Sequence, residues 1–473
     1  MSLPPDAARS ACGVRAARLN LADYATNFSD SHPPLTAAQA AIEAERCYYC
    51  FDAPCITACP TGIDIPSFIA RIAQGSNRGA AKTILQANPL GGMCARVCPT
   101  EVLCEQACVR NTNEDKPVEI GLLQRHATDA YFKAPHRDKS PLFTRASTTG
   151  KRIAVVGAGP AGLSCAHRLA VLGHDVVVFE TKPKPGGLNE YGLATYKTTD
   201  GFAQKEIAWL LSIGGIEVRY GQALGEQVTL AALNEGFDAV FLGMGLGGVN
   251  ALGIADAQVD GVAGLGNAVE FIAGLRQATD YGAVPVGKRV VVLGGGMTAV
   301  DAAVQSKKLG AEEVTIVYRR DQARMPASAH ERDWAQLNGV TLRTWSVLES
   351  LTAHTGAVTF ATFSKVAEVD GQLAETGEHW SLAADTVLKA IGQTLVLADP
   401  GLAAVKLRAG RIEVNEEGRT SLPSVWAGGD CTFGGQDLTV EAVEHGRIAA
   451  HSIHRALVAD APDTLKRVRK CAA

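Results

Sequence analysis

Cysteines are the residues of this sequence best suited to do chemistry, and most of them lie in one short stretch. Eight of the twelve cysteines of the 473-residue chain lie between positions 47 and 108. They form two groups of four: Cys47, Cys50, Cys55 and Cys59, then Cys94, Cys98, Cys104 and Cys108. Disulfides are rare in reducing compartments, and clustered cysteines in a cytosolic chain indicate metal binding. The pattern therefore predicts a metal-binding segment.

The spacing within the two groups favours iron–sulfur clusters over zinc. Thiolates are soft ligands that suit either metal. Each group contains a cysteine followed directly by proline, at Cys59 and at Cys98, which is similar to the arrangement in bacterial ferredoxins. A structural zinc site would use four ligands and would need no redox partner. Nucleotide-binding motifs further along the chain make electron carriers the better interpretation, and counting alone would give all eight cysteines to two 4Fe-4S clusters.

A glycine-rich turn after an apolar strand predicts the first nucleotide site. Residues 151–180 follow the order strand, turn, helix, strand, with Glu180 at the end of the second strand. Glycines in the turn let the backbone approach a pyrophosphate at the helix N-terminus, and the carboxylate can accept ribose hydroxyls. The segments at 186–188 and 427–430 resemble flavoprotein motifs, so we expect FAD. The candidate FAD-binding residues are Gly157, Gly159, Pro160, Ala161, Gly162, Glu180, Gly187, Leu188, Lys197, Gly429 and Asp430.

A second glycine-rich turn, within residues 288–320, predicts the nicotinamide site. The acidic residue expected for NADH at the end of its second strand is absent. Arg319 and Arg320 stand there instead, and an arginine at that place can accept the 2′-phosphate of NADPH. The alternative is that one or both arginines are solvated surface charges and that Asp321 contacts a ribose hydroxyl. The candidate nicotinamide-binding residues are Gly294, Gly295, Gly296, Met297, Thr298, Arg319, Arg320 and Gly392.

The elements that must position these residues are expected to form a multidomain fold. An α-helical N-terminal iron–sulfur domain would precede two α/β Rossmann-like domains. Because a flavin motif returns near the end of the sequence, the FAD-binding domain is predicted to be discontinuous. The predicted domains are 1–140 for the two 4Fe-4S clusters, 150–250 with 393–473 for FAD, and 251–392 for NAD(P)H. Residues 1–35 are expected to be an irregular leader.

Composition and charge argue against several classes of protein. The chain has 45 basic and 49 acidic residues, a net charge of −4, whereas a nucleic-acid-binding protein usually shows a basic excess. No run of about 18 apolar residues is present, so we expect no membrane span. The first twenty residues lack an apolar signal core, so we expect a cytoplasmic protein.

The predicted cofactors together indicate an electron-transfer oxidoreductase. NAD(P)H releases two electrons as hydride, clusters accept one electron at a time, and a flavin can exchange between the two modes. Hydride transfer to a flavin needs no protein acid or base, so we nominate no catalytic side chain. A disulfide reductase is disfavoured because the CxxC pair, Cys47 and Cys50, lies far upstream of both nucleotide motifs. Cys165 and Cys431 are expected to be structural.

Between residues 36 and 457 the chain resembles a known family. The motifs CYYCFDAPCITACP, NPLGGMCARVCPTEVLCEQAC, EIGLLQRHATD, VVGAGPAGL, GGGMTAVD and AGGD are similar to those of the glutamate synthase small-subunit family. They more closely resemble the electron-input half of dihydropyrimidine dehydrogenase. The segment LTVEAVEHGRIAA favours the pyrimidine branch and suggests that Thr439 lies near the flavin, whereas YRRD followed by MP resembles the glutamate branch.

The resemblance implies that cluster ligation is crossed between the two cysteine groups. One cluster would be held by Cys47, Cys50, Cys55 and Cys108, and the other by Cys59, Cys98, Cys104 and Gln124. Cys94 would then bind no iron. Without the match of EIGLLQ, Gln124 would be interpreted as an ordinary helix-surface amide.

The resemblance also implies a partner and a reaction. Uracil or thymine would be reduced to the 5,6-dihydropyrimidine, a reaction at a CH–CH group, on a separate catalytic subunit carrying FMN and further iron–sulfur clusters. The resemblance implies NADH, which the bacterial branch uses, against the indication from Arg319 and Arg320, so both nucleotides stay open and NADH is favoured. The alternatives are a glutamate synthase small subunit or related NADPH-dependent electron-transfer flavoprotein, and a non-catalytic assembly protein with zinc-filled cysteines.

Overall fold

The computed structural model describes residues 19–134, 141–254 and 261–458, and the chain divides into two compact units. The first unit comprises the described parts of 1–31, 191–199 and 249–393. The second comprises the described parts of 32–190, 200–248 and 394–473. The outer ends of the predicted domains at 1–18, 135–140 and 459–473 lie outside the described residues.

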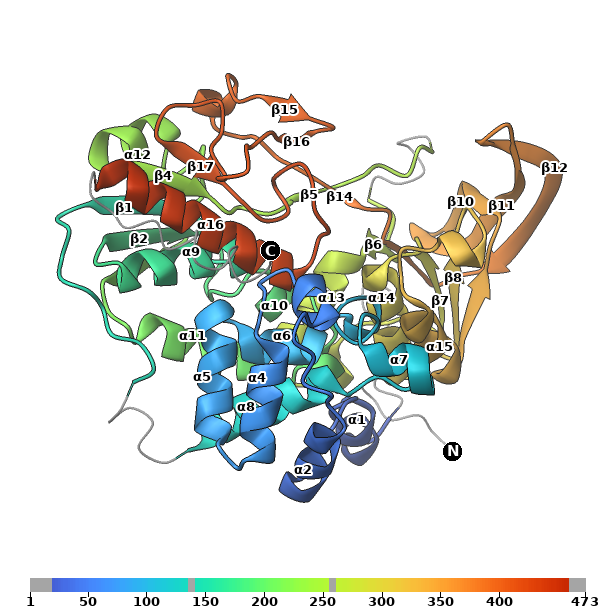
Figure 1. Ribbon diagram of the computed structural model, residues 1–473. Helices are drawn as coiled ribbons and strands as arrows, with labels where there is room; N and C mark the ends of the chain where they lie inside the picture. The colour runs from blue at the N-terminus through green and yellow to red at the C-terminus, as the bar shows by residue number, and fades with distance from the viewer. Residues whose placement is uncertain (1–18, 135–140, 255–260, 459–473) are drawn as a thin grey trace. The chain divides into compact units, whose positions relative to one another are not determined.

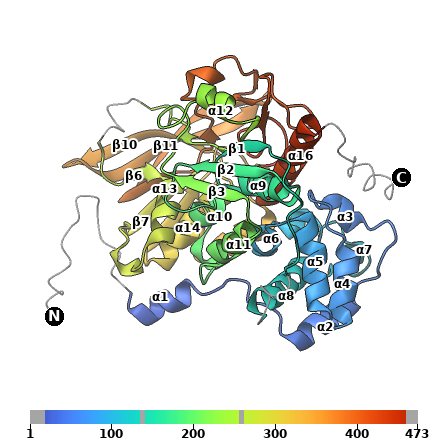
Figure 2. The ribbon, with the colours of Figure 1, turned by 90° about the vertical axis from the view of Figure 1, so that its left-hand side faces the viewer.

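The second unit begins with a helical bundle whose apolar faces pack together. Thr36 starts the first of its helices with a capping box, because its Oγ1 accepts from Gln39 N while the Gln39 side chain accepts from Thr36 N. Figure 2 shows α2, α4, α5 and α8 side by side, and Phe68 and Leu123 are fully buried in the shared core. The helices are α2 (Ala37–Glu45), α3 (Pro54–Ala58), α4 (Ile65–Ala73), α5 (Asn77–Ala87), α6 (Gly91–Val97), the 3₁₀ helix η1 (Thr100–Val102), α7 (Val109–Glu114) and α8 (Ile120–Lys133).

The rest of the second unit is a parallel five-stranded sheet in the order β17-β4-β1-β2-β3. Its strands are short apolar runs such as RIAVV, as expected where helices cover both faces. The late strand β17 pairs with β4, so the end of the chain completes the sheet, and α16 lies along α9 (Figure 1). The elements are β1 (Arg152–Val156), α9 (Pro160–Val171), β2 (Asp175–Glu180), α11 (Phe202–Leu211), β3 (Ile216–Tyr220), α12 (Leu230–Gly236), β4 (Ala239–Leu242), η7 (Pro400–Leu402), β15 (Leu407–Arg408), β16 (Arg411–Ile412), β17 (Val425–Ala427) and α16 (Thr439–Leu457).

The first unit contains a second parallel five-stranded sheet, in the order β6-β13-β7-β8-β9, and a three-stranded antiparallel sheet. The antiparallel sheet, β10-β11-β12, is inserted in the sequence between β9 and β13 (Figure 1). The elements are α1 (Leu21–Asn27), η3 (Thr195–Lys197), β6 (Leu265–Asn267), α13 (Ala268–Gln277), η5 (Tyr281–Ala283), β7 (Arg289–Leu293), α14 (Met297–Lys308), β8 (Glu313–Val317), η6 (Gln322–Arg324), α15 (Ala329–Leu337), β9 (Val340–Arg343), β10 (Ser346–His354), β11 (Ala357–Val369), β12 (Gln372–Ala383) and β13 (Thr386–Lys389). Three short elements occur where the sequence passes from one unit to the other: α10 (Leu188–Tyr191), β5 (Gly248–Val249) and β14 (Gln393–Thr394).

The structure differs from the sequence-based expectation near the N-terminus. The expected irregular leader contains α1, which Asn20 caps. Tyr24 and Phe28 are buried in the core of the first unit, and the ring of Phe28 lies 4.4 Å from that of Tyr281. Residues 19–31 therefore belong with the segment 249–393 and not with the helical bundle. Residues 191–199 also belong to the first unit, although 150–250 was expected to be one FAD-binding segment.

Among the described residues, no helix has the length and apolar character needed to cross a membrane.

Candidate iron–sulfur and nucleotide-binding sites

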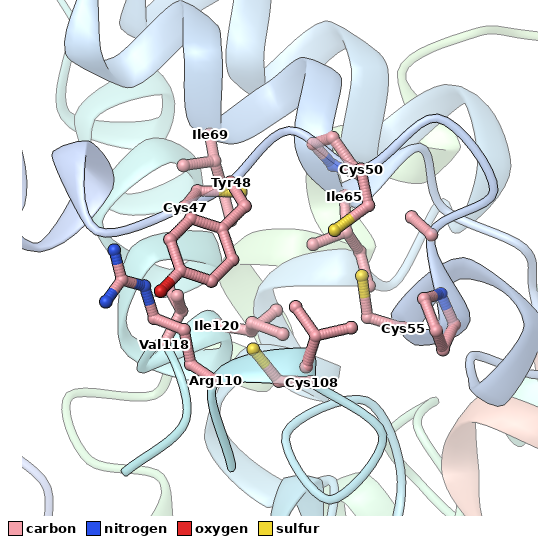
Figure 3. Close-up of a pocket in the computed structure, with 14 residues that line it drawn as sticks. Cys47, Tyr48, Cys50, Cys55, Ile65, Ile69, Cys108, Arg110, Val118 and Ile120 are labelled. Atoms are coloured by element: carbon pink, nitrogen blue, oxygen red, sulfur yellow. The ribbon is translucent and has the colours of Figure 1, made fainter. Parts of the chain in front are cut away.

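Four cysteines from both sequence groups line one pocket of the helical bundle, which we call pocket 1. They are Cys47, Cys50, Cys55 and Cys108. Cys47 follows α2, Cys55 lies in α3, and Cys108 precedes α7, so three separate helix ends bring them together. In Figure 3 the sulfur atoms of Cys50, Cys55 and Cys108 are directed toward the same central space. This is the first of the two ligand sets that the resemblance implied.

Apolar side chains and one aromatic ring complete the wall of pocket 1. Ile65, Ile69 and Ile120 line it from α4 and α8. Tyr48 stands at its edge beside Arg110 (Figure 3), whose Cζ lies 4.0 Å from the centre of the ring. The Tyr48 hydroxyl donates to Glu114 Oε1 at 3.1 Å, and Arg110 forms an ion pair with the same carboxylate. The ring is thus held over the pocket by a cation–π contact and a hydrogen bond.

The thiols of pocket 1 hold their protons tightly when no metal is bound. Burial raises the pKa of the Cys55 thiol to about 12, and the neighbouring Cys108 and Cys47 add to the rise. Burial also raises the pKa of Cys47, although Tyr49 N donates to its sulfur and opposes the shift. Because a metal binds the thiolate, loading this pocket must release protons.

A second pocket, pocket 2, holds the other implied ligand set together with one extra cysteine. Its wall includes Cys59, Cys94, Cys98, Cys104 and Gln124. Cys59 directly follows α3 and Cys98 directly follows α6, while Gln124 lies in α8 with only 8% of its surface exposed. The Gln124 amide Nε2 donates to Gly91 O at 2.7 Å, which leaves Oε1 as the atom with which this side chain could bind iron. Ile65 lines this pocket as well as pocket 1.

A buried carboxylate fixes the start of α6, the helix that contains Cys94 and directly precedes Cys98. Glu206 of α11 is fully buried and accepts hydrogen bonds from Gly92 N at 2.7 Å and Met93 N at 3.1 Å. Burial raises the pKa of Glu206 to about 8, although these two donors oppose the shift. Arg96 donates to Gly92 O at 2.9 Å. Glu206 thereby joins the flavin-type half of this unit to the helix that contains Cys94 and directly precedes Cys98.

The two pockets suit iron–sulfur clusters by the chemistry of their donors. Each offers soft thiol ligands within an apolar wall, which is the donor set of ferredoxin-type clusters. Tetrahedral zinc needs its ligands about 2.0–2.3 Å from one centre. The described residues contain no group of three or more His, Cys, Asp or Glu side chains placed to hold a single metal ion.

The first glycine-rich turn has the geometry of a pyrophosphate cradle. Gly157 has φ +96°, and a Cβ there would lie 2.5 Å from Gly243 O, so only glycine fits between β1 and α9. A Cβ on Gly159 would meet only Gly187 Cα, at 3.9 Å, so the approach to the N-terminus of α9 is open. Glu180 ends β2, and its carboxylate accepts from Ala158 N at 2.7 Å and from Lys182 N at 2.8 Å. These features fit the nucleotide half of FAD.

The remaining candidate flavin residues of the second unit lie at the end of β17 and the start of α16. Gly429 N donates to His445 Nδ1 at 3.2 Å. Burial, with help from the nearby Asp437, raises the pKa of Asp430 to about 6. Thr439, the first residue of α16, donates from its hydroxyl to Asn189 Oδ1 at 2.8 Å, next to Leu188 in the sequence. The structure therefore associates the 187–189 segment with the start of α16.

Lys197 is grouped differently from the other candidate FAD residues. It lies in the first unit, where its Nζ contacts Asp301 Oδ1 at 2.8 Å and Glu331 Oε1 at 2.7 Å. Burial alone would lower the pKa of Lys197, but the two carboxylates outweigh burial and raise it. The lysine is thus a buried, charged member of an ion triad, a role that its position in the sequence did not indicate.

The second glycine-rich turn joins β7 to α14 in the first unit. Gly294 has φ +141°, and a Cβ there would lie 2.1 Å from Ala390 O. A Cβ on Gly296 would meet no atom within 4 Å, so space for a phosphate is open at the N-terminus of α14, where Met297 and Thr298 begin the helix. These features fit a nicotinamide dinucleotide.

The residues expected to select the nicotinamide nucleotide lie around the same sheet. Arg319 and Arg320 follow β8; Arg319 is exposed, and Arg320 Nε is buried without a hydrogen-bond partner in the described chain. Asp321 instead caps the 3₁₀ helix η6 by accepting from Arg324 N at 2.8 Å. Gly392 follows β13 with φ +96°. Which nucleotide these residues select stays a prediction.

Two family models match this chain, one in its cysteine-rich part and one in its nucleotide-binding part. Residues 24–135 match the family model described as dihydropyrimidine dehydrogenase domain II, 4Fe-4S cluster. Residues 151–446 match the model for pyridine nucleotide-disulphide oxidoreductases. Among solved structures, Mycobacterium tuberculosis FprA in complex with NADPH has a TM-score of 0.55 at 20% identity, covering 68% of this chain and 90% of that one. At that identity the likeness shows the fold alone.

Two curated relatives that match nearly the whole chain indicate more closely which kind of oxidoreductase it resembles. The NAD-dependent dihydropyrimidine dehydrogenase subunit PreT of Salmonella typhimurium is 33% identical over 435 residues, which are 92% of this chain and 98% of the relative. The glutamate synthase [NADPH] small chain of Escherichia coli K12 is 33% identical over 459 residues, which are 90% of this chain and 93% of the relative.

Fold, pockets and matches together define the class of this protein: a pyridine nucleotide-disulphide oxidoreductase with an N-terminal 4Fe-4S domain. It is an electron-transfer flavoprotein that uses FAD, 4Fe-4S clusters and a nicotinamide nucleotide. Within that class, the chain belongs to the family of NAD-dependent dihydropyrimidine dehydrogenase subunit PreT, and it is similar to the glutamate synthase small chain as well. The fold class and the cofactors predicted from the sequence are thereby confirmed.

Sequence reasoning did not find two residues that shape the cluster pockets. Glu206 lies 114 positions from Gly92, and nothing in its local sequence indicates that contact. Asn88 lines pocket 2 next to Cys94. The only available sign for Asn88 was its place in the motif NPLGGMC, between two helices.

Proposed function

We propose that this chain is the electron-input subunit of a dihydropyrimidine dehydrogenase. It would oxidise NAD(P)H at FAD and pass the electrons through two 4Fe-4S clusters to a partner subunit that reduces uracil or thymine to 5,6-dihydropyrimidines. The observation that carries this proposal is the likeness to PreT over 98% of that relative's length, together with two thiol pockets in the matched 4Fe-4S domain.

Each cofactor has a candidate set of residues in the chain. Pocket 1 would hold one cluster on Cys47, Cys50, Cys55 and Cys108, and pocket 2 the other on Cys59, Cys98, Cys104 and Gln124. The turn between β1 and α9, with Glu180, Gly429, Asp430 and Thr439, would bind FAD. The turn between β7 and α14, with Arg319, Arg320 and Gly392, would bind the nicotinamide nucleotide.

The chain's own residues bind and orient these groups, and none is required as an acid or base. Bound FAD supplies the exchange between two-electron and one-electron transfer, and bound clusters supply one-electron transfer. The glycine turns let backbone N–H groups reach the pyrophosphates. Glu180, fixed by two backbone donors, keeps lone pairs for ribose hydroxyls. The pocket thiols release their protons when iron binds.

The proposed partner is a catalytic subunit carrying FMN and further iron–sulfur clusters, in a heteromeric complex in the cytoplasm. The relative's name describes it as a subunit, which supports a complex of this kind. The proposed reaction, at a CH–CH group, takes place on that partner. We propose NADH as the favoured donor because the relative is named NAD-dependent, and Arg320 is the residue that would instead favour NADPH.

A glutamate synthase small subunit is the second candidate. The identity of 33% to the Escherichia coli small chain and the YRRD segment at 318–321 favour it. In that case the partner would be a large glutamine amidotransferase subunit.

Isolation of the native partner with a tagged form of this chain separates the two proposals. We expect a subunit with FMN and iron–sulfur clusters, and loss of uracil absorbance when the complex receives NADH. A glutamine amidotransferase as the partner would overturn the first proposal. Rates with NADH and NADPH, for the native chain and for Arg320→Ala, measure the nucleotide preference.

A further inference from the structure

Pocket 2 offers five donors where one 4Fe-4S cluster takes four ligands. The fifth is Cys94, which lines the pocket together with the proposed ligands Cys59, Cys98, Cys104 and Gln124. Its exposed fraction is 2%, so it belongs to the pocket wall and not to the protein surface. Pocket 1 has no such surplus, since four cysteines line it.

The sulfur of Cys94 is held in place by a buried amide. Asn88, which is completely buried between α5 and α6, donates from Nδ2 to Cys94 Sγ at 3.1 Å. The other side of the same amide is fixed, because Asn88 Oδ1 accepts from Leu90 N at 2.9 Å. The thiol of Cys94 also contacts the thiol of Cys98, which directly follows the last residue of α6.

The side chain of Gln124, from α8, is hydrogen-bonded to α6, the short helix that contains Cys94. Gln124 Nε2 donates to Gly91 O at the first residue of α6, and Cys94 is the fourth residue of that helix. Glu206 fixes the intervening residues through Gly92 N and Met93 N. The amide of Gln124, from α8, and the thiol of Cys94, from α6, thus line the same pocket, and the first turn of α6 connects them.

We propose that Cys94 is a reserve ligand of the cluster in pocket 2, able to take the place of Gln124. The proposal rests on the ligand set given under the proposed function. In the exchange, the bond from iron to Gln124 Oε1 breaks and a bond from iron to Cys94 Sγ forms. The thiol proton leaves to solvent, and no electron is gained or lost. Replacing a neutral amide by a thiolate makes the cluster more negative, which lowers its reduction potential.

The test compares Gln124→Ala, Cys94→Ala and the double variant in the full chain, purified and reconstituted without oxygen. Iron and acid-labile sulfide are measured per chain, and the electron paramagnetic resonance spectrum is recorded after reduction. We expect Cys94→Ala to keep both clusters unchanged. We expect Gln124→Ala to keep both clusters, with a changed spectrum and a lower potential for one of them. The double variant should lose that cluster and about half of the iron.

Three results would overturn the proposal. Loss of the cluster in Gln124→Ala alone would mean that Cys94 cannot replace the amide. Loss in Cys94→Ala alone would make Cys94 the ordinary ligand. Retention of both clusters in the double variant would place the fourth ligand elsewhere.

Controls separate a missing ligand from a damaged fold. Cys165→Ala removes a buried cysteine of α9 that lies outside both pockets, so Gln124→Ala with Cys165→Ala should match Gln124→Ala alone. Gln124→Leu repeats the comparison with a side chain of similar volume next to α6. In every variant, the bound flavin and the spectrum of the other cluster show whether the chain has folded. If the native chain binds no iron after reconstitution, that result contradicts the proposed function itself, whatever the variants show.

Discussion

Pockets 1 and 2 are built from the same kind of sequence but differ in what surrounds the thiols. Pocket 1 is lined by one half-exposed aromatic residue: Tyr48 is 50% exposed, and it stacks on Arg110. Pocket 2 is enclosed by buried groups, among them Asn88 and Gln124, and its helix α6 is fixed by Glu206. Hydrogen bonds to sulfur, solvent exposure and net charge set the potential of a cluster. The comparison teaches that cysteine spacing selects the kind of cofactor, whereas the neighbours of each pocket distinguish one cluster from the other.

The largest expected effect is the loss of one whole cluster when a single cysteine is replaced, which tests which cysteines bind in which pocket. Cys108→Ala should remove the cluster of pocket 1, because Cys108 lines that pocket although it belongs to the second group in the sequence. Cys104→Ala should remove the other cluster. Each change should lower bound iron by about half, as two four-iron clusters require. Paramagnetic resonance of the reduced variants identifies the lost signal, and loss of the same signal in both would break the assignment.

The next effect concerns the side chain that the pockets share. Ile65→Ala should cost about 2–5 kcal/mol in the free energy of unfolding, because a buried isoleucine leaves a cavity when it is shortened. Since Ile65 is 2% exposed and lines both pockets, the spectra of both clusters should change. Unfolding by urea and resonance spectra check this prediction. Ile42→Ala, at a position 66% exposed, is the matched control and should leave both measurements nearly unchanged.

A pH dependence should distinguish the surroundings of pocket 2. The pKa of Glu206 is raised by burial to about 8 in the folded chain, above its value near 4.3 in an unfolded one. The folded state therefore binds this proton more tightly, and the stability that it contributes is lost as pH rises from about 4.3 to about 8. Relative to Glu206→Gln, which does not titrate there, native stability should fall by up to about 1.4 kcal/mol per pH unit. Urea midpoints at pH 5, 6, 7 and 8 measure the difference, and parallel curves for the two proteins would contradict it.

The smallest effect concerns the aromatic cover of pocket 1. Tyr48→Ala should speed the loss of iron from that pocket to a chelator severalfold, because the ring no longer limits access of solvent. Tyr48→Phe should lose less, since the stacking on Arg110 remains and only the hydrogen bond to Glu114 is removed. Phe51→Ala is the control, because Phe51 is exposed and lies outside the pocket wall. Equal rates of iron loss in all three variants would show that Tyr48 does not protect pocket 1, and Tyr48 would then not distinguish the two pockets.

Local sequence was enough to predict the nucleotide folds and the kind of metal centre. Strand, glycine turn and helix follow one another within about thirty residues, so the β1–α9 and β7–α14 units could be recognised without knowledge of distant contacts. The cap at Thr36 is equally local. The return of the chain as β17 could be inferred because the AGGD motif lies at its end.

The remaining features depend on contacts between distant parts of the sequence. Helix α1 has only seven residues, and Phe28 just after it packs on Tyr281, so local pattern alone did not predict it. Glu206 and Lys197 are ordinary charged residues in the sequence, and their burial depends on partners about a hundred positions away. The gathering of Cys108 with the first cysteine group rested on resemblance, because counting alone assigned all eight cysteines to two clusters without saying which cysteine binds which cluster.

Ile65 lines both pockets, and its position affects the order in which two bound clusters would be reduced. Because one apolar side chain lines both pockets, we expect a charge added to one bound cluster to act on the other with less screening than in water. We expect the pair to be reduced in sequence rather than at a common potential, so that the first electron makes the second harder to add.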